Sequence, residues 1–220
     1  MRLKFGVAVA GSHGKTTTTS MTAQVLEVAG LDPTVIIGGV AKSLKTGGKL
    51  GRSEYLVAES DESDRSFLLL KPTIAIVTNI DLEHMESYAD EKDLEDSFYN
   101  FVDSIPFYGL AILCIDDERV KKLSDKLKKR KVTYGFSDSA DLRAENLKPK
   151  KNHTEFTVLF HNKVLGTIDL PIPGKHLVSN SLAVIAVGLE FGLTFETIKA
   201  GLESFSGVER RFEILSDKFG

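Results

Sequence analysis

Short apolar runs alternate with longer segments of helical periodicity over the first two-thirds of the chain. The predicted strands are Leu3–Ala10, Thr34–Ile37, Tyr55–Glu59, Ile74–Thr78, Leu110–Ile115 and Val132–Tyr134. Several are continuously apolar and rich in Val and Ile, which is typical of strands covered on both faces. The predicted helices between them are Thr16–Ala29, Glu91–Ser104 and Asp117–Lys129. This alternation predicts an α/β fold with a doubly wound, mainly parallel sheet flanked by helices.

The period of the pattern changes around residue 140. The segments Thr154–Phe160 and Val164–Leu170 alternate apolar with polar residues, and His161, Asn162 and Lys163 between them can make a tight hairpin. Together with Asp141–Leu147, they predict a small antiparallel sheet near residues 140–171, beside the main one.

Two further helices are expected after the chain break at Pro171–Gly174. They are predicted at His176–Phe191 and Thr194–Ser204, with Gly192 ending the first as a C-cap. The loop Gly38–Gly51 holds four glycines besides Gly38, so we expect it to be the most mobile segment.

Composition narrows the class of protein. The 220 residues are 42% apolar and 27% charged, and the net charge is −3. This length allows one substantial core, and the slight acidity argues against a nucleic-acid-binding surface. No apolar run reaches the roughly 18 residues of a membrane span, and no charged-then-apolar leader opens the chain. We therefore expect a cytoplasmic protein.

The single cysteine and a basic run are both explained by structure without a functional role. Cys114 is the one cysteine and lies inside an apolar run, so it is interpreted as a small core residue. The basic run Lys121–Lys131 carries Leu123 and Leu127 four residues apart, which indicates one buried stripe and a solvated charged face. A polyphosphate or nucleic-acid patch is the alternative interpretation of that run.

The strongest functional signal is the run Gly11–Thr19, GSHGKTTTT, which follows a buried-type strand and opens a helix. Glycines let the backbone direct several N–H groups at phosphate oxygens, and the helix N-terminus adds its dipole. Lys15 would reach the β and γ phosphates, and the Thr16 hydroxyl would ligate Mg²⁺. The standard spacing would place a glycine at Val9, so this loop is a shorter variant. The alternative is a glycine-rich turn with an incidental lysine.

Two acidic clusters follow neighbouring predicted strands. Glu59–Asp64 (ESDESD) and Asn79–His84 (NIDLEH) would both lie at the carboxyl ends of parallel strands, where ligands gather. Glu59 is the first carboxylate past its strand and the best single magnesium ligand. A second metal would explain His84. A solvated acidic loop and a surface or capping histidine remain the alternatives.

Taken together, several stretches resemble the Mur ligase family in family order and over nearly the whole chain. The matching stretches are Gly11–Thr19, Glu59–Leu70, Thr78–Tyr88, Phe98–Asp117, Ile172–Ala183 and Gly207–Phe212. The closest resemblance is to the alanine-adding branch. It implies that ATP phosphorylates the carboxylate of UDP-N-acetylmuramate to an acyl phosphate, and that the amine of L-alanine then attacks to form an amide. ATP and Mg²⁺ would be the cofactors.

The resemblance also implies residue roles. Thr16 and Glu59 resemble ligands of a first magnesium and His84 a ligand of a second, and Lys15, Glu59 and His84 would form the catalytic set. The nucleotide contacts that it implies are Gly11, Ser12, His13, Gly14, Lys15, Thr16, Thr17, His176, Asn180 and Arg211. His176 and Asn180 would lie on the adenine side, and Arg211 near the phosphates. Leu177 departs from the family, which usually has asparagine there.

The resemblance covers one domain of a three-domain enzyme. We expect residues 1–220 to be the central ATP-binding domain, without the N-terminal UDP-binding and C-terminal domains. Such a fragment would bind Mg-ATP but would not ligate, because the muramate nucleotide and L-alanine need the missing domains.

Three alternatives to the alanine-adding ligase remain. One is a sister ligase that adds a preformed peptide to the same muramate nucleotide. A folate-polyglutamylating relative would typically carry Gly-Lys-Gly-Ser where this chain has Gly14–Thr17 as GKTT. A non-ligating P-loop module, such as a switch GTPase, would not need the HLVSN and GVERRF motifs. Its guanine-specific Asn-Lys-x-Asp is also missing, because Ile80 stands in the lysine position.

Overall fold

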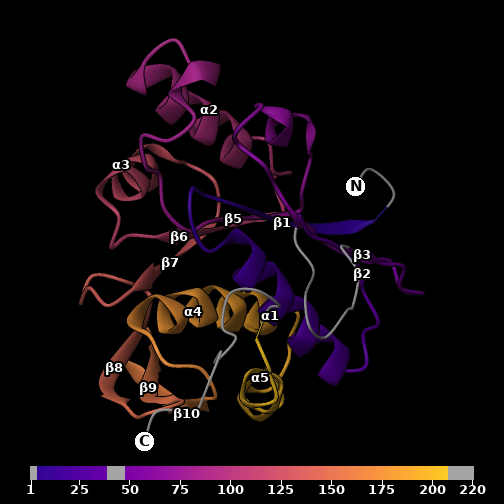
Figure 1. The fold of residues 1–220 in the computed structure, drawn as a ribbon, viewed down its shortest axis with the longest axis vertical. Helices are drawn as coiled ribbons and strands as arrows, with labels where there is room; N and C mark the ends of the chain where they lie inside the picture. The colour runs from indigo at the N-terminus through magenta and orange to yellow at the C-terminus, as the bar shows by residue number, and fades with distance from the viewer. Residues whose placement is uncertain (1–3, 39–47, 208–220) are drawn as a thin grey trace, which may run out of the picture.

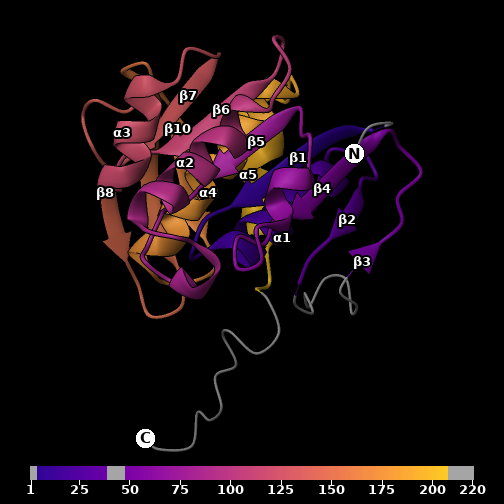
Figure 2. The ribbon, with the colours of Figure 1, turned by 90° about the horizontal axis from the view of Figure 1, so that it is seen from above.

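The computed structural model describes residues 4–38 and 48–207, and these form a sheet of ten strands in the order β10-β9-β8-β7-β6-β5-β1-β4-β2-β3. The strands are β1 (Phe5–Ala10), β2 (Thr34–Ile36), β3 (Gly48–Lys49), β4 (Tyr55–Glu59), β5 (Ile74–Val77), β6 (Leu110–Cys114), β7 (Lys131–Gly135), β8 (Leu142–Pro149), β9 (Thr154–Phe160) and β10 (Lys163–Leu170). Figure 2 shows β7 to β3 side by side in this order. Seven successive strands of this order, from β8 through β7, β6, β5, β1 and β4 to β2, are each paired in parallel with the next. The predicted mainly parallel sheet is therefore confirmed.

Five α-helices cover the sheet in the described ranges. They are α1 (Lys15–Val28), α2 (Glu91–Asp103), α3 (Glu118–Lys126), α4 (Lys175–Glu190) and α5 (Phe195–Glu203). Each coincides with a predicted helix to within a few residues. Two short 3₁₀ helices, Ser66–Leu69 and Met85–Ser87, and the two-residue strand β3 were not predicted. The predicted mobile loop Gly38–Gly51 falls largely on residues 39–47, which lie outside the described residues.

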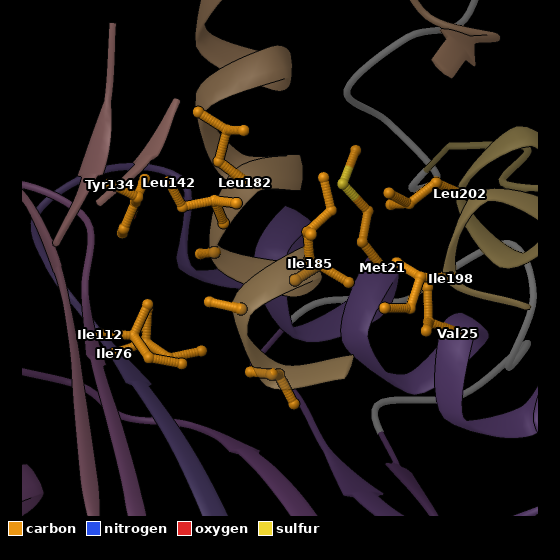
Figure 3. Close-up of a cluster of buried hydrophobic side chains, with 14 of the residues drawn as sticks. Met21, Val25, Ile76, Ile112, Tyr134, Leu142, Leu182, Ile185, Ile198 and Leu202 are labelled. Carbon is orange, nitrogen blue, oxygen red and sulfur yellow. The ribbon is translucent and has the colours of Figure 1, made fainter. Parts of the chain in front are cut away.

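Each face of the parallel sheet is covered by its own helices, because alternate residues of a strand enter different cores. Val7 and Val9 of β1 belong to the core under α1, α4 and α5, whereas Ala8 and Ala10 belong to the core under α2 and α3. The larger core is shown in Figure 3, where Met21 of α1, Ile185 of α4 and Ile198 of α5 converge. Burial on both faces explains why the strand sequences are continuously apolar.

The antiparallel strands β8, β9 and β10 continue the main sheet instead of forming a separate one. β8 pairs in parallel with β7, at Tyr134 with Leu142 and Gly135 with Arg143. In Figure 1, α4 runs between the β6–β7 part of the sheet and the β8–β10 part, and α4 contacts β6, β7 and β8. Leu142 and Phe156 share one core with the parallel strands, so a common set of apolar contacts joins the two parts.

Local signals that the sequence predicted are present at the chain turns. His161 and Asn162 have positive φ values of 47° and 64°, as a tight hairpin between β9 and β10 requires. Gly192 has φ 72°, and the amide of Leu193 donates to the carbonyl of Gly188, which closes α4.

The structural interpretations of Cys114 and of the basic run Lys121–Lys131 are confirmed. Cys114 is buried in the core, and burial raises the pKa of its thiol. In the basic run, Leu123 and Leu127 are buried, while the lysines around them include four exposed ones, Lys121, Lys122, Lys126 and Lys128. Across the described ranges, no helix has the length and apolarity needed to cross a membrane.

Candidate nucleotide-binding site

The loop Gly11–Gly14 connects the carboxyl end of β1 to the first residue of α1. Gly11 has φ 131°, and a Cβ there would lie 2.1 Å from Oγ1 of Thr78. Gly14 has φ 85°, and a Cβ there would lie 2.7 Å from Oδ1 of Asn180. Both positions therefore need glycine for two reasons, backbone conformation and close approach of another element.

The end of β5 holds this loop in place. The amide of Asn79 accepts from the backbone N–H of His13 at 2.8 Å and donates to the carbonyl of the same residue at 3.0 Å. Thr78 Oγ1 also donates to the carbonyl of His13, at 2.6 Å. The hydroxyl of Ser12 accepts from the amide of Asp81 at 2.8 Å. A loop fixed by so many bonds from a neighbouring strand has little freedom left to lose when it binds a ligand.

The first turn of α1 presents groups suited to an anion. Gly14 at the N-cap provides no side-chain cap, and it lies at the positive end of the helix dipole. The side chain of Lys15 folds back over the loop, where its Nζ lies 2.7 Å from the carbonyl oxygen of Gly11. The loop thus brings together the lysine and the helix N-terminus that phosphate binding needs.

Thr16 and Glu59 meet beside the loop. Oγ1 of Thr16 donates to Oε1 of Glu59 at 2.8 Å, and the amide of Gly38 donates to Oε2 at 2.8 Å. Both side chains border a pocket of about 100 Å³ lined by Ser12, His13, Gly14, Lys15, Thr16 and Glu59. Hard oxygens on a hydroxyl and a carboxylate fit Mg²⁺, which takes its remaining ligands from water and substrate phosphates. Thr17 is buried at the next helical position and does not border this pocket.

His84 is not brought to this pair. It lies at the start of the 3₁₀ helix 85–87 with φ 56° and is 44% exposed, and its Nδ1 is 3.6 Å from Oε1 of Glu86. His13 is the histidine that faces the acidic segment after β5, because its Nε2 lies 3.1 Å from Asp81 and 3.5 Å from Glu83. Within residues 4–38 and 48–207, no three His, Cys, Asp or Glu side chains gather closely enough to hold a metal ion.

A second, larger cavity of about 820 Å³ opens beside the loop Gly11–Gly14 and is lined in part by Thr78, which bonds to His13. It is lined by the ends of β5, β6 and β7 and by the first turns of α3 and α4. His176 and Asn180 of α4 both line it, and Asn180 also packs against Gly14 of the loop. The two pockets therefore adjoin at Asn180. Arg211, the remaining predicted contact, lies outside the described residues.

An acidic turn after β6 arranges part of the wall of the larger cavity. The carboxylate of Asp116 accepts from the amides of Phe136 and Ser137, which fixes the residues after β7. Lys175 places its ammonium 4.5 Å from the ring centre of Phe136. Leu177, the departure from the family pattern, is 1% exposed and packs in the core. Packing therefore explains its apolar side chain. His176 and Asn180 of α4 line the cavity, and Leu177 does not.

Sequence reasoning missed four residues of this site. Thr78, Asn79 and Glu62 contact the loop residues directly, and Asp81 faces His13. Glu62, Asn79 and Asp81 lie within the two segments singled out in the sequence, and Thr78 ends the predicted strand before the second one, but no spacing rule selects any of them. Only the register of β5 and the turn after β4 decide which of these side chains face the loop.

Comparison with known proteins gives the family. The profile of the Mur ligase middle domain matches residues 9–188. The UDP-N-acetylmuramate–L-alanine ligase of Desulfatibacillum aliphaticivorans is 56% identical over 213 residues, which cover 97% of this chain and 47% of that protein. The chain thus spans about half the length of the curated relatives that it matches.

Solved structures agree with the sequence comparison. The crystal structure of UDP-N-acetylmuramate–alanine ligase from Thermotoga maritima superposes with a TM-score of 0.86 at 32% identity, covering 97% of this chain and 47% of that one. The structure of UDP-N-acetylmuramate:L-alanyl-γ-D-glutamyl-meso-diaminopimelate ligase from Neisseria meningitides gives a TM-score of 0.85 at 28% identity and covers 95% of this chain and 68% of that one. The chain belongs to the Mur ligase family.

Proposed function

We propose that residues 1–220 form the ATP-binding central domain of a ligase that joins L-alanine to UDP-N-acetylmuramate. The observation that carries this proposal is the loop Gly11–Gly14 with Lys15, Thr16 and Glu59 grouped at the carboxyl ends of β1 and β4. The 56% identity to an alanine-adding relative supports the choice of reaction. We propose peptidoglycan precursor synthesis as the process that this ligase serves and the cytoplasm as its compartment.

In this proposal, the loop residues position the triphosphate and balance its charge. Lys15 and the amides at the start of α1 contact the β and γ phosphates, and Thr16 and Glu59 hold Mg²⁺. The bound Mg²⁺ supplies charge neutralisation at the phosphates. The muramate carboxylate attacks the γ phosphorus, the bond from that phosphorus to the β,γ-bridging oxygen breaks, and ADP leaves as the acyl phosphate forms. The amine of L-alanine then attacks the acyl carbon, and phosphate leaves as the amide forms.

The adenine is proposed to occupy the larger cavity. Asn180 is 7% exposed, lines this cavity and lies against Gly14 of the loop. One side chain would therefore lie between the proposed site of the base and that of the phosphates. An amide can both donate to and accept from a base edge. His176 borders the same cavity. Arg211 near the phosphates and His84 at a second magnesium complete the proposed set.

Ligation is proposed to need more than this domain. The muramate nucleotide and L-alanine would contact those parts of the relatives that this chain does not span. Domain closure also keeps water from an acyl phosphate. We expect the 220-residue chain to bind Mg-ATP and to show no alanine-dependent release of ADP.

A peptide-adding ligase is the second candidate, because the Neisseria meningitides enzyme superposes almost as well as the alanine-adding one. An ADP-release assay on the parent protein with Mg-ATP and UDP-N-acetylmuramate separates the two. The proposal predicts turnover with L-alanine and little with L-alanyl-γ-D-glutamyl-meso-diaminopimelate. Turnover with the tripeptide alone would contradict it.

A further inference from the structure

The ammonium of Lys15 is surrounded by acceptors of the protein itself. Its Nζ lies 2.7 Å from the carbonyl oxygen of Gly11, 3.2 Å from that of Ser12 and 2.9 Å from each carboxylate oxygen of Glu62. A lysine ammonium has three N–H donors and no acceptor. Two carbonyls and one carboxylate therefore use all three donors. A phosphate oxygen can bond to Lys15 only by replacing one of these partners or by sharing a donor with it.

Glu62 carries a buried carboxylate on a turn whose backbone is held by other residues. Its side chain is 3% exposed, against 15% for that of Lys15. The hydroxyl of Tyr88 and the amide of Arg65 both donate to its backbone carbonyl. Arg65 in turn lies over the ring of Tyr88 and pairs with Asp93. The turn that carries Glu62 is thus fixed from α2 and from the 3₁₀ segment before it.

Lys15 is the sole cation within ion-pair distance of Glu62 among residues 4–38 and 48–207. If Lys15 turned wholly to a phosphate, the Glu62 carboxylate would be left buried without a counter-charge. Stranding one member of a buried pair is costly. The negative charge of Glu62 also lies beside the place where a polyphosphate would bind, and like charges repel. Both effects oppose phosphate binding.

We propose that Glu62 is a built-in counter-ion of Lys15 that competes with nucleotide phosphate and makes phosphate binding depend on Mg²⁺. This inference rests on the proposed nucleotide-binding function. Glu62 is a positioning residue, because it acts on the phosphates through Lys15. Free ADP carries more negative charge than Mg-ADP, so Glu62 opposes free ADP more strongly. Glu62 therefore selects the magnesium-bound form of the nucleotide.

The test compares wild type with Glu62→Gln by calorimetry, using ADP in EDTA, ADP with excess Mg²⁺, and adenosine. Glutamine keeps the size and one acceptor but removes the charge. We expect Glu62→Gln to tighten binding of free ADP about tenfold, and Mg-ADP by less, since a nearby charge acts most on the most highly charged ligand. Adenosine, which lacks phosphates, should bind both proteins alike.

Three variants sharpen the test. Asp61→Asn removes an exposed charge from the same segment without touching Lys15, and should tighten free ADP less than Glu62→Gln does. Glu62→Asp keeps the charge and should bind free ADP as weakly as wild type. Glu62→Met is the second neutral variant, in case glutamine is poorly tolerated in the core. Circular dichroism and melting temperatures confirm that each variant folds.

The outcomes separate the inference from the function on which it rests. If wild type binds Mg-ADP and the neutral variants bind free ADP no more tightly than wild type, the counter-ion role is wrong and the nucleotide site stands. If Asp61→Asn tightens binding of free ADP as much as Glu62→Gln does, the effect comes from negative charge in general and not from the contact with Lys15. That result would also overturn the counter-ion role. If no folded protein of the set binds ADP with or without Mg²⁺, the proposed function fails, and the inference fails with it.

Discussion

The side-chain amide of Asn79 forms two hydrogen bonds with the backbone of His13, one to its N–H and one to its carbonyl. The end of β5 thereby fixes the middle of a loop that starts at the end of β1. The loop Gly11–Gly14 is thus held by its neighbouring strand as well as by its own glycines.

The Asn79–His13 bonds give the first prediction. Asn79→Ala should lower the free energy of unfolding by about 1–3 kcal/mol, because it removes both hydrogen bonds to the backbone N–H and carbonyl of His13. It should also weaken Mg-ADP binding, since the loop must then be ordered by the ligand. Denaturant unfolding and calorimetry measure the two effects. Asn100→Ala, at an exposed position on α2, is the matched control. Equal effects at the two positions would contradict the proposed support of the loop.

The close approach at Gly11 gives the second prediction. Gly11→Ala should be more destabilising than Gly30→Ala, although both glycines have positive φ values, 131° and 75°. At Gly30 nothing lies within 4 Å of the added Cβ, so only the backbone strain of about 1 kcal/mol remains. At Gly11 the new atom also collides with Thr78. Melting temperatures of the two variants compare these costs. The prediction fails if Gly30→Ala melts at the same temperature or lower.

The contact between Thr16 and Glu59 gives the third prediction. Thr16→Val should reduce the effect of Mg²⁺ on ADP affinity, because the variant loses a proposed ligand. Affinity for ADP in EDTA should change much less. Thr19→Val is the control, since Oγ1 of Thr19 is buried without a hydrogen-bond partner in the described part of the chain. A Thr16→Val variant that keeps the full magnesium effect would contradict the assignment.

The phenol of Tyr88 gives a prediction in pH. Burial, and then the charge of Glu62, raises the pKa of Tyr88 to about 12. In the unfolded chain the pKa is about 10. Because the folded value is raised, the contribution of the neutral phenol is complete below about pH 10 and is lost as the pH rises towards 12. The stability difference between wild type and Tyr88→Phe should be constant up to about pH 9 and shrink above pH 10. Urea unfolding across this range measures it, and a difference that grows above pH 10 would contradict the sign.

The sequence predicts those site residues whose position follows from the secondary-structure elements next to them in the chain. Gly11–Thr16 is recognisable because strand, loop and helix are consecutive, and Glu59 because it is the first carboxylate after β4. Asn79 is ordinary in sequence, and its role depends on which side chain of β5 turns towards the loop. His84 also follows β5, but it does not line the pocket bordered by Thr16 and Glu59, and its Nδ1 lies beside Glu86 instead.

The fold shows the same division. The strands and helices follow from hydrophobic periodicity, so nearly all were predicted. The parallel pairing of β7 with β8 was not, because it depends on Tyr134 and Leu142 packing in one core beneath α4. Similarly, β3 has two residues, which is too short a segment to show a period.

The most direct test of the central claim is a calorimetric titration of Mg-ATP into the wild-type chain and into Lys15→Ala, with Lys71→Ala, an exposed lysine, as the control. The account predicts saturable binding by wild type and Lys71→Ala, and binding that is lost or greatly weakened in Lys15→Ala. Equal binding by Lys15→Ala, or no binding by a folded wild-type chain, would contradict it.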